Sequence, residues 1–71
     1  MTELQHQLLE EAEEALRSVA AGHVYEIPDA IMKAHGWEHA AFINATIQLA
    51  DFPITITWRP NGDVTYVRDD V

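Results

Sequence analysis

The fold of this 71-residue chain depends on one stretch, HAAFINATIQLA, which occupies residues 39–50. Taken as a strand, the stretch alternates between apolar residues that point to the core and polar residues that point to solvent. Taken as a helix, it places Asn44 and Gln48 on one polar face and leaves nearly every other position apolar. Both interpretations account for the pattern, so the ends of the stretch must decide between them.

Local signals at these ends favour the strand. No Ser, Thr, Asp or Asn stands where it would cap a helix, and no Lys or Arg lies in the last turn. Asp51 would face the negative end of a helix dipole. The β-branched residues Ile43, Thr46 and Ile47 are typical of strands. We therefore predict a strand over residues 39–50.

The N-terminal segment, from Thr2 to Ala21, carries the clearest helical pattern in the chain. Its apolar residues recur at three- and four-residue steps and form one stripe along a helix. Thr2 and Gln5 have the spacing of a capping box. Gly22 directly follows the periodic residues, which is the place of a left-handed helix stop.

The C-terminal segment predicts a β-hairpin. Apolar and polar residues alternate over 54–59, and the sequence Pro-Asn-Gly at residues 60–62 suits a type I turn that ends in a left-handed glycine. This register places Trp58 opposite Val64 and Ile56 opposite Tyr66. We expect Trp58 in the core together with the two phenylalanines, Phe42 and Phe52.

The strand interpretation gives an α+β fold, with the N-terminal amphipathic helix and a short second helix over 28–35 packed on a three-stranded antiparallel meander. The helical interpretation of residues 38–50 gives a short helix, a glycine turn, a second helix and a hairpin, which resembles a winged helix-turn-helix. This resemblance covers roughly the last two-thirds of the chain. The apolar skeleton that carries it consists of Ile31, Gly36, Trp37, Phe42 and Ala45. Under either interpretation, residues 1–71 form a single small acidic domain.

The charge balance restricts the classes of partner. The chain has 12 Asp and Glu against 4 Lys and Arg, for a formal net charge of −8. Nucleic-acid binders neutralise phosphates with clustered Lys and Arg, so this balance argues against direct nucleic-acid binding and equally against an anionic membrane surface. Without a signal-like N-terminus or a long apolar run, the expected location is the cytoplasm, or the host cytoplasm if the protein is phage-encoded.

The residue types needed for catalysis are scarce. The chain has no cysteine, its lone serine has no histidine nearby, and its three glycines form no phosphate-binding loop. His35 and His39 are four residues apart, but Gly36 lies between them at a predicted helix end. We therefore expect no enzymatic activity, no metal and no cofactor.

The acidic residues point instead to protein binding. Carboxylates at steps of three and four on a helix stand about 5–6 Å apart, which is comparable in scale to the phosphates of DNA. We predict a non-enzymatic inhibitor that occludes a basic, nucleic-acid-binding surface of a partner protein, as phage anti-CRISPR or transcription-inhibitor proteins do. Trp37, expected to be partly exposed, is a candidate interface anchor. The predicted partner-binding residues are Glu3, Glu10, Glu11, Glu13, Glu14, Trp37, Asp63, Asp69 and Asp70.

Other interpretations compete with this one. The helical reading of 38–50 suggests a small winged-helix transcriptional regulator or antitoxin, although Trp37 to Ala50 contains no Lys or Arg for phosphate contacts. The small core suggests an accessory domain that dimerises through a sheet edge, so we expect a monomer or a weak homodimer. The acidic excess also has a purely solubilising explanation, because net charge keeps a small domain dispersed.

Overall fold

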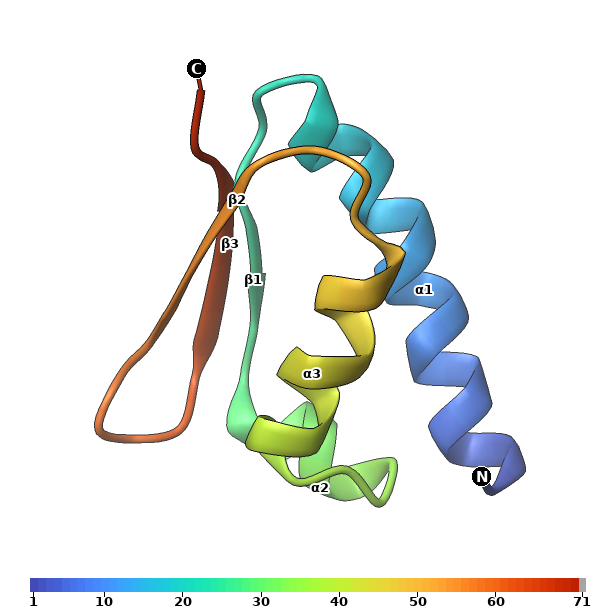
Figure 1. The fold of residues 1–71 in the computed structure, drawn as a ribbon. Coiled ribbons are helices and arrows are strands. Elements are labelled where there is room, and N and C mark those ends of the chain that lie inside the picture. The colour runs from blue at the N-terminus through green and yellow to red at the C-terminus, as the bar shows by residue number, and fades with distance from the viewer. Residues whose placement is uncertain (71) are drawn as a thin grey trace.

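The computed structural model describes residues 1–70, and its three helices lie on one face of a three-stranded sheet (Figure 1). The elements, in chain order, are α1 (Glu3–Ala20), β1 (Tyr25–Ile27), α2 (Asp29–Ala34), α3 (His39–Leu49), β2 (Ile54–Trp58) and β3 (Val64–Arg68). The sheet is antiparallel with the strand order β1-β3-β2, which confirms the predicted α+β class. Within residues 1–70, no helix combines the length and the apolar character of a membrane span.

Helix α1 forms as the sequence predicts. The Thr2 side chain accepts a hydrogen bond from the Gln5 backbone, and the Gln5 side chain accepts one from the Thr2 backbone, so the capping box is complete. Gly22 adopts a φ of 99° just beyond the helix, in the left-handed region that favours glycine. The buried stripe of α1 consists of Leu8, Ala12, Leu16 and Val19.

The predicted strand over residues 39–50 is wrong, because His39–Leu49 form helix α3. The structure confirms that end signals are weak, since Glu38 provides no side-chain cap, the first turn contains no acidic residue and the last turn contains no basic one. Such end effects are worth about 1 kcal/mol each. A strand would send Phe42 and Ile43 to opposite faces, whereas the helix buries both on one face. Burying a large apolar side chain contributes about 1.5–3 kcal/mol. The burial of Phe42 and Ile43 therefore outweighs the missing signals at the helix ends.

The third strand of the sheet is therefore β1, which pairs with β3 through Tyr25 opposite Tyr66 and Ile27 opposite Val64. The predicted hairpin register is confirmed, with Trp58 opposite Val64 and Ile56 opposite Tyr66. The succession of α2, a glycine turn, α3 and the hairpin is the order of elements that the helical interpretation of 38–50 predicts.

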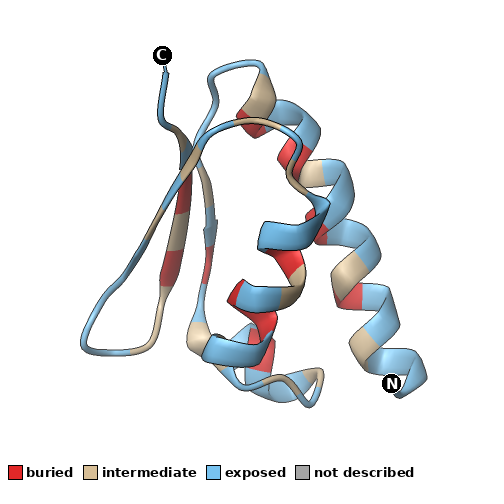
Figure 2. Ribbon diagram, in the orientation of Figure 1, coloured by how far each residue is buried: buried red, intermediate tan, exposed pale blue. Residues whose placement is uncertain are grey.

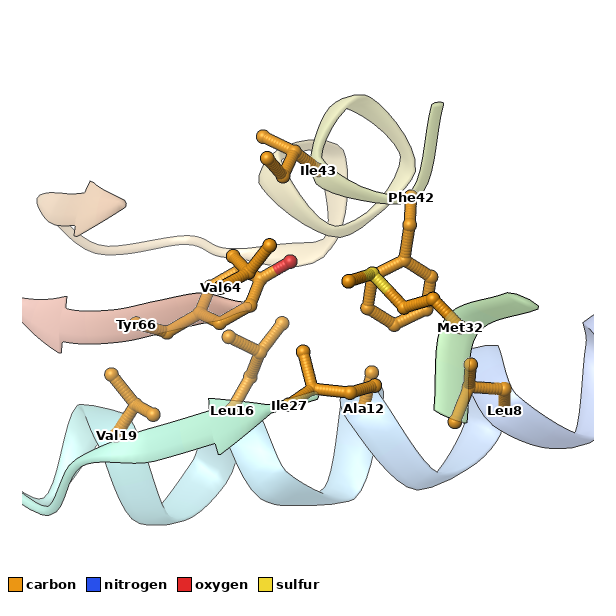
Figure 3. Packing of buried hydrophobic residues seen from close by; sticks show 10 residues of the cluster. All are labelled: Leu8, Ala12, Leu16, Val19, Ile27, Met32, Phe42, Ile43, Val64 and Tyr66. Carbon is orange, nitrogen blue, oxygen red and sulfur yellow. The ribbon is translucent and has the colours of Figure 1, made fainter. Parts of the chain in front are cut away.

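The core lies between the helices and the two strands β1 and β3. Side chains from α1, β1, α2, α3 and β3 converge on it (Figure 3), whereas β2 contains no fully buried residue (Figure 2). Phe42 is fully buried and Phe52 is half-buried, but Trp58 is 57% exposed, contrary to its predicted place in the core. Trp58 ends the edge strand β2, and its ring has the His39 ring at the start of α3 as a neighbour, 6.5 Å away between centroids, which leaves more than half of the side chain exposed.

One polar contact crosses this core. The hydroxyl of Thr46 on α3 lies 2.7 Å from the hydroxyl of Tyr66 on β3, and both residues are buried. The Thr46 hydroxyl also lies 2.9 Å from the Phe42 carbonyl oxygen, to which it can donate. Because burial disfavours the charged phenolate, the pKa of Tyr66 is raised to about 12.

Thr46→Val should lower the free energy of unfolding by about 1–3 kcal/mol, because it leaves the Tyr66 hydroxyl buried without its partner. Tyr66→Phe should cost less, since the Thr46 hydroxyl keeps its bond to the Phe42 carbonyl. In the double variant neither hydroxyl remains, so its loss should be smaller than the sum of the single losses. Urea unfolding of the four proteins measures this coupling, and strict additivity would contradict it.

Candidate functional site

Five glutamates project from the outward side of α1, opposite its buried stripe, and all five are exposed. Glu3, Glu10 and Glu14 lie nearly in line along the helix, with Glu11 and Glu13 on either side of that line. At 1.5 Å per residue, the line is about 16 Å long. We call Glu3, Glu10, Glu11, Glu13 and Glu14 the acidic face of α1.

Positive charge does little to neutralise the acidic face. Three of the four Lys and Arg side chains pair with carboxylates elsewhere: Lys33 with Asp29, Arg59 with Glu26 and Arg68 with Asp70. Arg17 is the one cation of α1 itself. Within residues 1–70, the side-chain contact that reaches the acidic face is between His6 Nε2 and Glu10 Oε1, 2.8 Å apart. Five carboxylates against one guanidinium therefore leave a local excess of negative charge.

The middle of the acidic face is slightly hollowed. Gln7, Glu10, Glu11 and Glu14 surround a shallow, open depression of about 260 Å³. The three carboxylates around the depression supply only acceptor oxygens. The Gln7 amide adds one more acceptor oxygen and two N–H donors. This arrangement suits an ammonium or guanidinium group from outside the chain.

Asp63, another predicted site residue, is engaged inside the fold. Its Oδ1 accepts a hydrogen bond of 3.0 Å from the backbone N–H of Asp29, the first residue of α2. Pro28 precedes this helix and makes no side-chain cap, so Asp63 supplies the cap from the hairpin loop. Gly62, with φ at 93°, lies so close that an added Cβ would come within 2.7 Å of the Asp29 side chain.

Trp37 is half-buried and connects the turn between α2 and α3 to helix α1. Its Nε1 donates a 2.9 Å hydrogen bond to the Gln5 carbonyl oxygen, and its ring packs edge-on against Phe42 at 5.5 Å between centroids. The Gln5 side chain returns a 2.8 Å bond from Nε2 to the Gly36 carbonyl oxygen. The indole N–H is therefore already satisfied within the fold.

Asp69 and Asp70 lie just after β3, at the C-terminal end of the sheet. Asp69 Oδ1 accepts a 2.6 Å hydrogen bond from the Thr55 hydroxyl, and Asp70 pairs with Arg68, which holds the pKa of that carboxyl below its usual range. Figure 1 shows the C-terminal end of the chain and the start of α1 at opposite ends of the molecule. The structure thus gathers the five glutamates of α1 but does not bring Trp37, Asp63, Asp69 or Asp70 to them.

The outward side of α3 carries no charge. Its exposed residues include Ala40, Ala41, Asn44 and Gln48, and Ile47 is 47% exposed. In helix-turn-helix proteins the second helix enters the major groove, where Asn and Gln can pair with adenine. α3 offers these two amides but no cation for the phosphates.

A pocket of about 400 Å³ opens between the α2–α3 turn and the hairpin loop, with Trp37, His39 and Pro60 among its lining residues. The lining has three charged residues, of which Lys33 and Asp29 already pair at 2.8 Å between Nζ and Oδ2, and Glu38 is the third. Across residues 1–70, no three His, Cys, Asp or Glu side chains are grouped as metal ligands.

One exposed feature was missed at the level of sequence, namely the outer edge of the sheet at β2, which ends in the exposed Trp58. A signal for it is present, since residues 52–58 form an uncharged, β-branched run between Asp51 and Arg59. In the predicted three-stranded meander this run forms the middle strand, and only the observed strand order shows that β2 is an edge.

Comparisons with protein-family models, with curated proteins and with solved structures found no match to this chain. The functional conclusion therefore depends on the residues and their geometry.

Asp63→Ala should lower the free energy of unfolding by about 1 kcal/mol, because α2 loses its cap and the hairpin loop loses its attachment to α2. Asp63→Asn is the matched control, since its amide oxygen can still accept from the Asp29 N–H and should preserve much of this stability. Thermal unfolding of the two variants would contradict the capping role if Asn and Ala proved equally destabilising.

Proposed function

We propose that this protein is a non-enzymatic binding protein whose acidic face of α1 docks on a basic, nucleic-acid-binding surface of a partner protein and occludes it. One observation carries this proposal. Five exposed glutamates share one side of a single helix, while most of the chain's cations are paired elsewhere.

Electrostatics explains how such a face would recognise its partner. Concentrated negative charge on a rigid helix steers a positively charged surface toward it and speeds association at low salt. The depression between Glu10, Glu11 and Glu14 can receive one Lys or Arg side chain of the partner. Because α1 is fixed by its buried stripe, the backbone positions of the five glutamates are set before binding.

The class of action proposed is that of a nucleic-acid mimic, as in phage anti-CRISPR or transcription-inhibitor proteins, acting in the cytoplasm of the cell or host. A basic groove built to neutralise phosphates would bind a row of carboxylates through the same Lys and Arg residues. Binding would then exclude the nucleic acid by direct competition.

The test is a competition experiment. A tagged form of the chain recovers its partner from the source cell, and the purified partner is titrated with a fluorescent DNA duplex in the presence and absence of the chain. We expect the chain to displace the duplex, with an affinity that falls as salt rises. Glu10→Gln, Glu13→Gln and Glu14→Gln together should weaken binding by about tenfold, from three partly screened ion pairs.

The matched control removes three negative charges elsewhere, through Glu26→Gln, Glu38→Gln and Asp69→Asn. This variant should bind nearly as tightly as the unmodified chain. If the two triple variants lost affinity equally, net charge rather than the acidic face would determine binding. If the partner held the chain and the duplex at the same time, occlusion would be refuted.

A second candidate, a DNA-binding winged-helix regulator, is favoured by the observed succession of α2, the turn, α3 and the hairpin. It requires Asn44 and Gln48 to contact bases without cationic neighbours on α3. The same duplex mixed with the chain alone decides between the two candidates. A gel shift that Asn44→Ala and Gln48→Ala abolish would support this candidate, and a free duplex would reject it.

A further inference from the structure

The sheet has two edges, and they differ in how well they are protected. At one edge, β1 is only three residues long, contains Glu26 and is ended by Pro28. Short length, charge and proline are features that keep an edge strand from pairing with another chain. At the other edge, β2 is five residues long and has no charge from Ile54 to Trp58.

The hydrogen bonds show which backbone groups β2 leaves open. The Arg59 N–H donates to the Asp63 carbonyl oxygen at 2.9 Å, and the Asp69 N–H donates to the Pro53 carbonyl oxygen at 3.0 Å. Hydrogen-bonded positions alternate along an antiparallel pair, so residues 53, 55, 57 and 59 face β3. The N–H and C=O groups of Ile54, Ile56 and Trp58 therefore point away from the sheet.

The side chains of these same three residues are incompletely covered. They share the face of the sheet that packs on the helices, because they stand opposite Arg68, Tyr66 and Val64. Ile54 and Ile56 are half-buried, and Trp58 is 57% exposed. The edge thus combines open backbone groups with an apolar row.

We propose that this edge pairs with β2 of a second copy of the chain, antiparallel and centred on Ile56, so that two sheets join into one of six strands. In this register Ile56 meets the second copy's Ile56, and Ile54 meets the second copy's Trp58. Each of these pairs exchanges two backbone hydrogen bonds, so every open group of the strand is satisfied. A two-fold axis through Ile56 relates the two copies. The assembly stops at two chains, because both β2 edges are paired with each other in the dimer.

The residues around the seam fit this arrangement. Thr57 stands opposite the second copy's Thr55, a favourable cross-strand pair. Arg59, just beyond the strand, pairs with Glu26 of its own chain, so its charge is balanced next to the seam. The pairing stops there because Pro60, at the next outward-facing position, has no N–H to donate.

The proposed dimer is independent of the acidic face. Helix α1 packs against α3, β1 and β3, so it lies toward the opposite edge of the sheet (Figure 1). The seam itself carries no acidic side chain between residues 52 and 58. With only five residues paired on each side, the interface is small, and the association should be weak and reversible.

The test is sedimentation velocity of the full chain over about a hundredfold range of concentration. The apparent mass should rise from that of the 8.0 kDa monomer toward twice that value. Thr55→Lys with Thr57→Lys should abolish the rise, because each new lysine would stand opposite a lysine of the second copy. Thr55→Lys with Thr57→Glu is the matched control, since it keeps the lysine beside Asp69, places opposite charges across the seam and should preserve the dimer.

Amide hydrogen exchange provides a residue-level readout. In dilute solution the Ile54, Ile56 and Trp58 amides should exchange rapidly, and at high concentration they should become protected. The Thr55 and Thr57 amides, which face β3, should be protected at both concentrations. A monomer at every concentration would overturn the proposal, as would a dimer that the double lysine variant leaves intact.

Discussion

The buried contact between the Thr46 and Tyr66 hydroxyls, 2.7 Å apart, is the constraint on which the arrangement of this protein depends. It joins α3 to β3, the central strand of the sheet, at a point where both residues are inaccessible to water. A polar group buried this deeply must find a partner, so the contact admits one depth and rotation of α3 on the sheet. The turn before α3 is attached to α1 by its own hydrogen bonds, between Trp37 and Gln5 and between Gln5 and Gly36.

The consequences extend to both proposed surfaces. With α3 packed against β3 and α1, the helices occupy the face of the sheet near β1 and β3 and leave β2 at an open edge. The acidic face of α1 is left outward for the same reason, because the opposite side of that helix is used in the core. The packing of α3 against β3 and α1 therefore determines which charged and which apolar groups remain available to other molecules.

Sequence patterns predicted the features that depend on neighbours in the chain. The capping box of Thr2 and Gln5, the hairpin register and the left-handed Gly62 all follow from short-range chemistry. The acidic face could also be predicted, since helical periodicity alone separates the glutamates from the buried stripe. Features that depend on long-range packing could not be predicted from sequence patterns. The helix at 39–49 needed the knowledge that Phe42 and Ile43 are buried together, and the capping role of Asp63 needed the hairpin to meet α2.

Alkaline titration of the tyrosines tests the burial of Tyr66 most directly. Its pKa is raised from 10.0 to about 12 by burial, so the stabilising effect of the neutral phenol is complete below pH 10 and is lost as the pH rises toward 12. We expect tyrosinate absorbance to show a step that appears only near pH 12, together with loss of the fold, and Tyr66→Phe to remove that step. Ionisation of Tyr66 near pH 10 in a protein that stays folded would contradict the account.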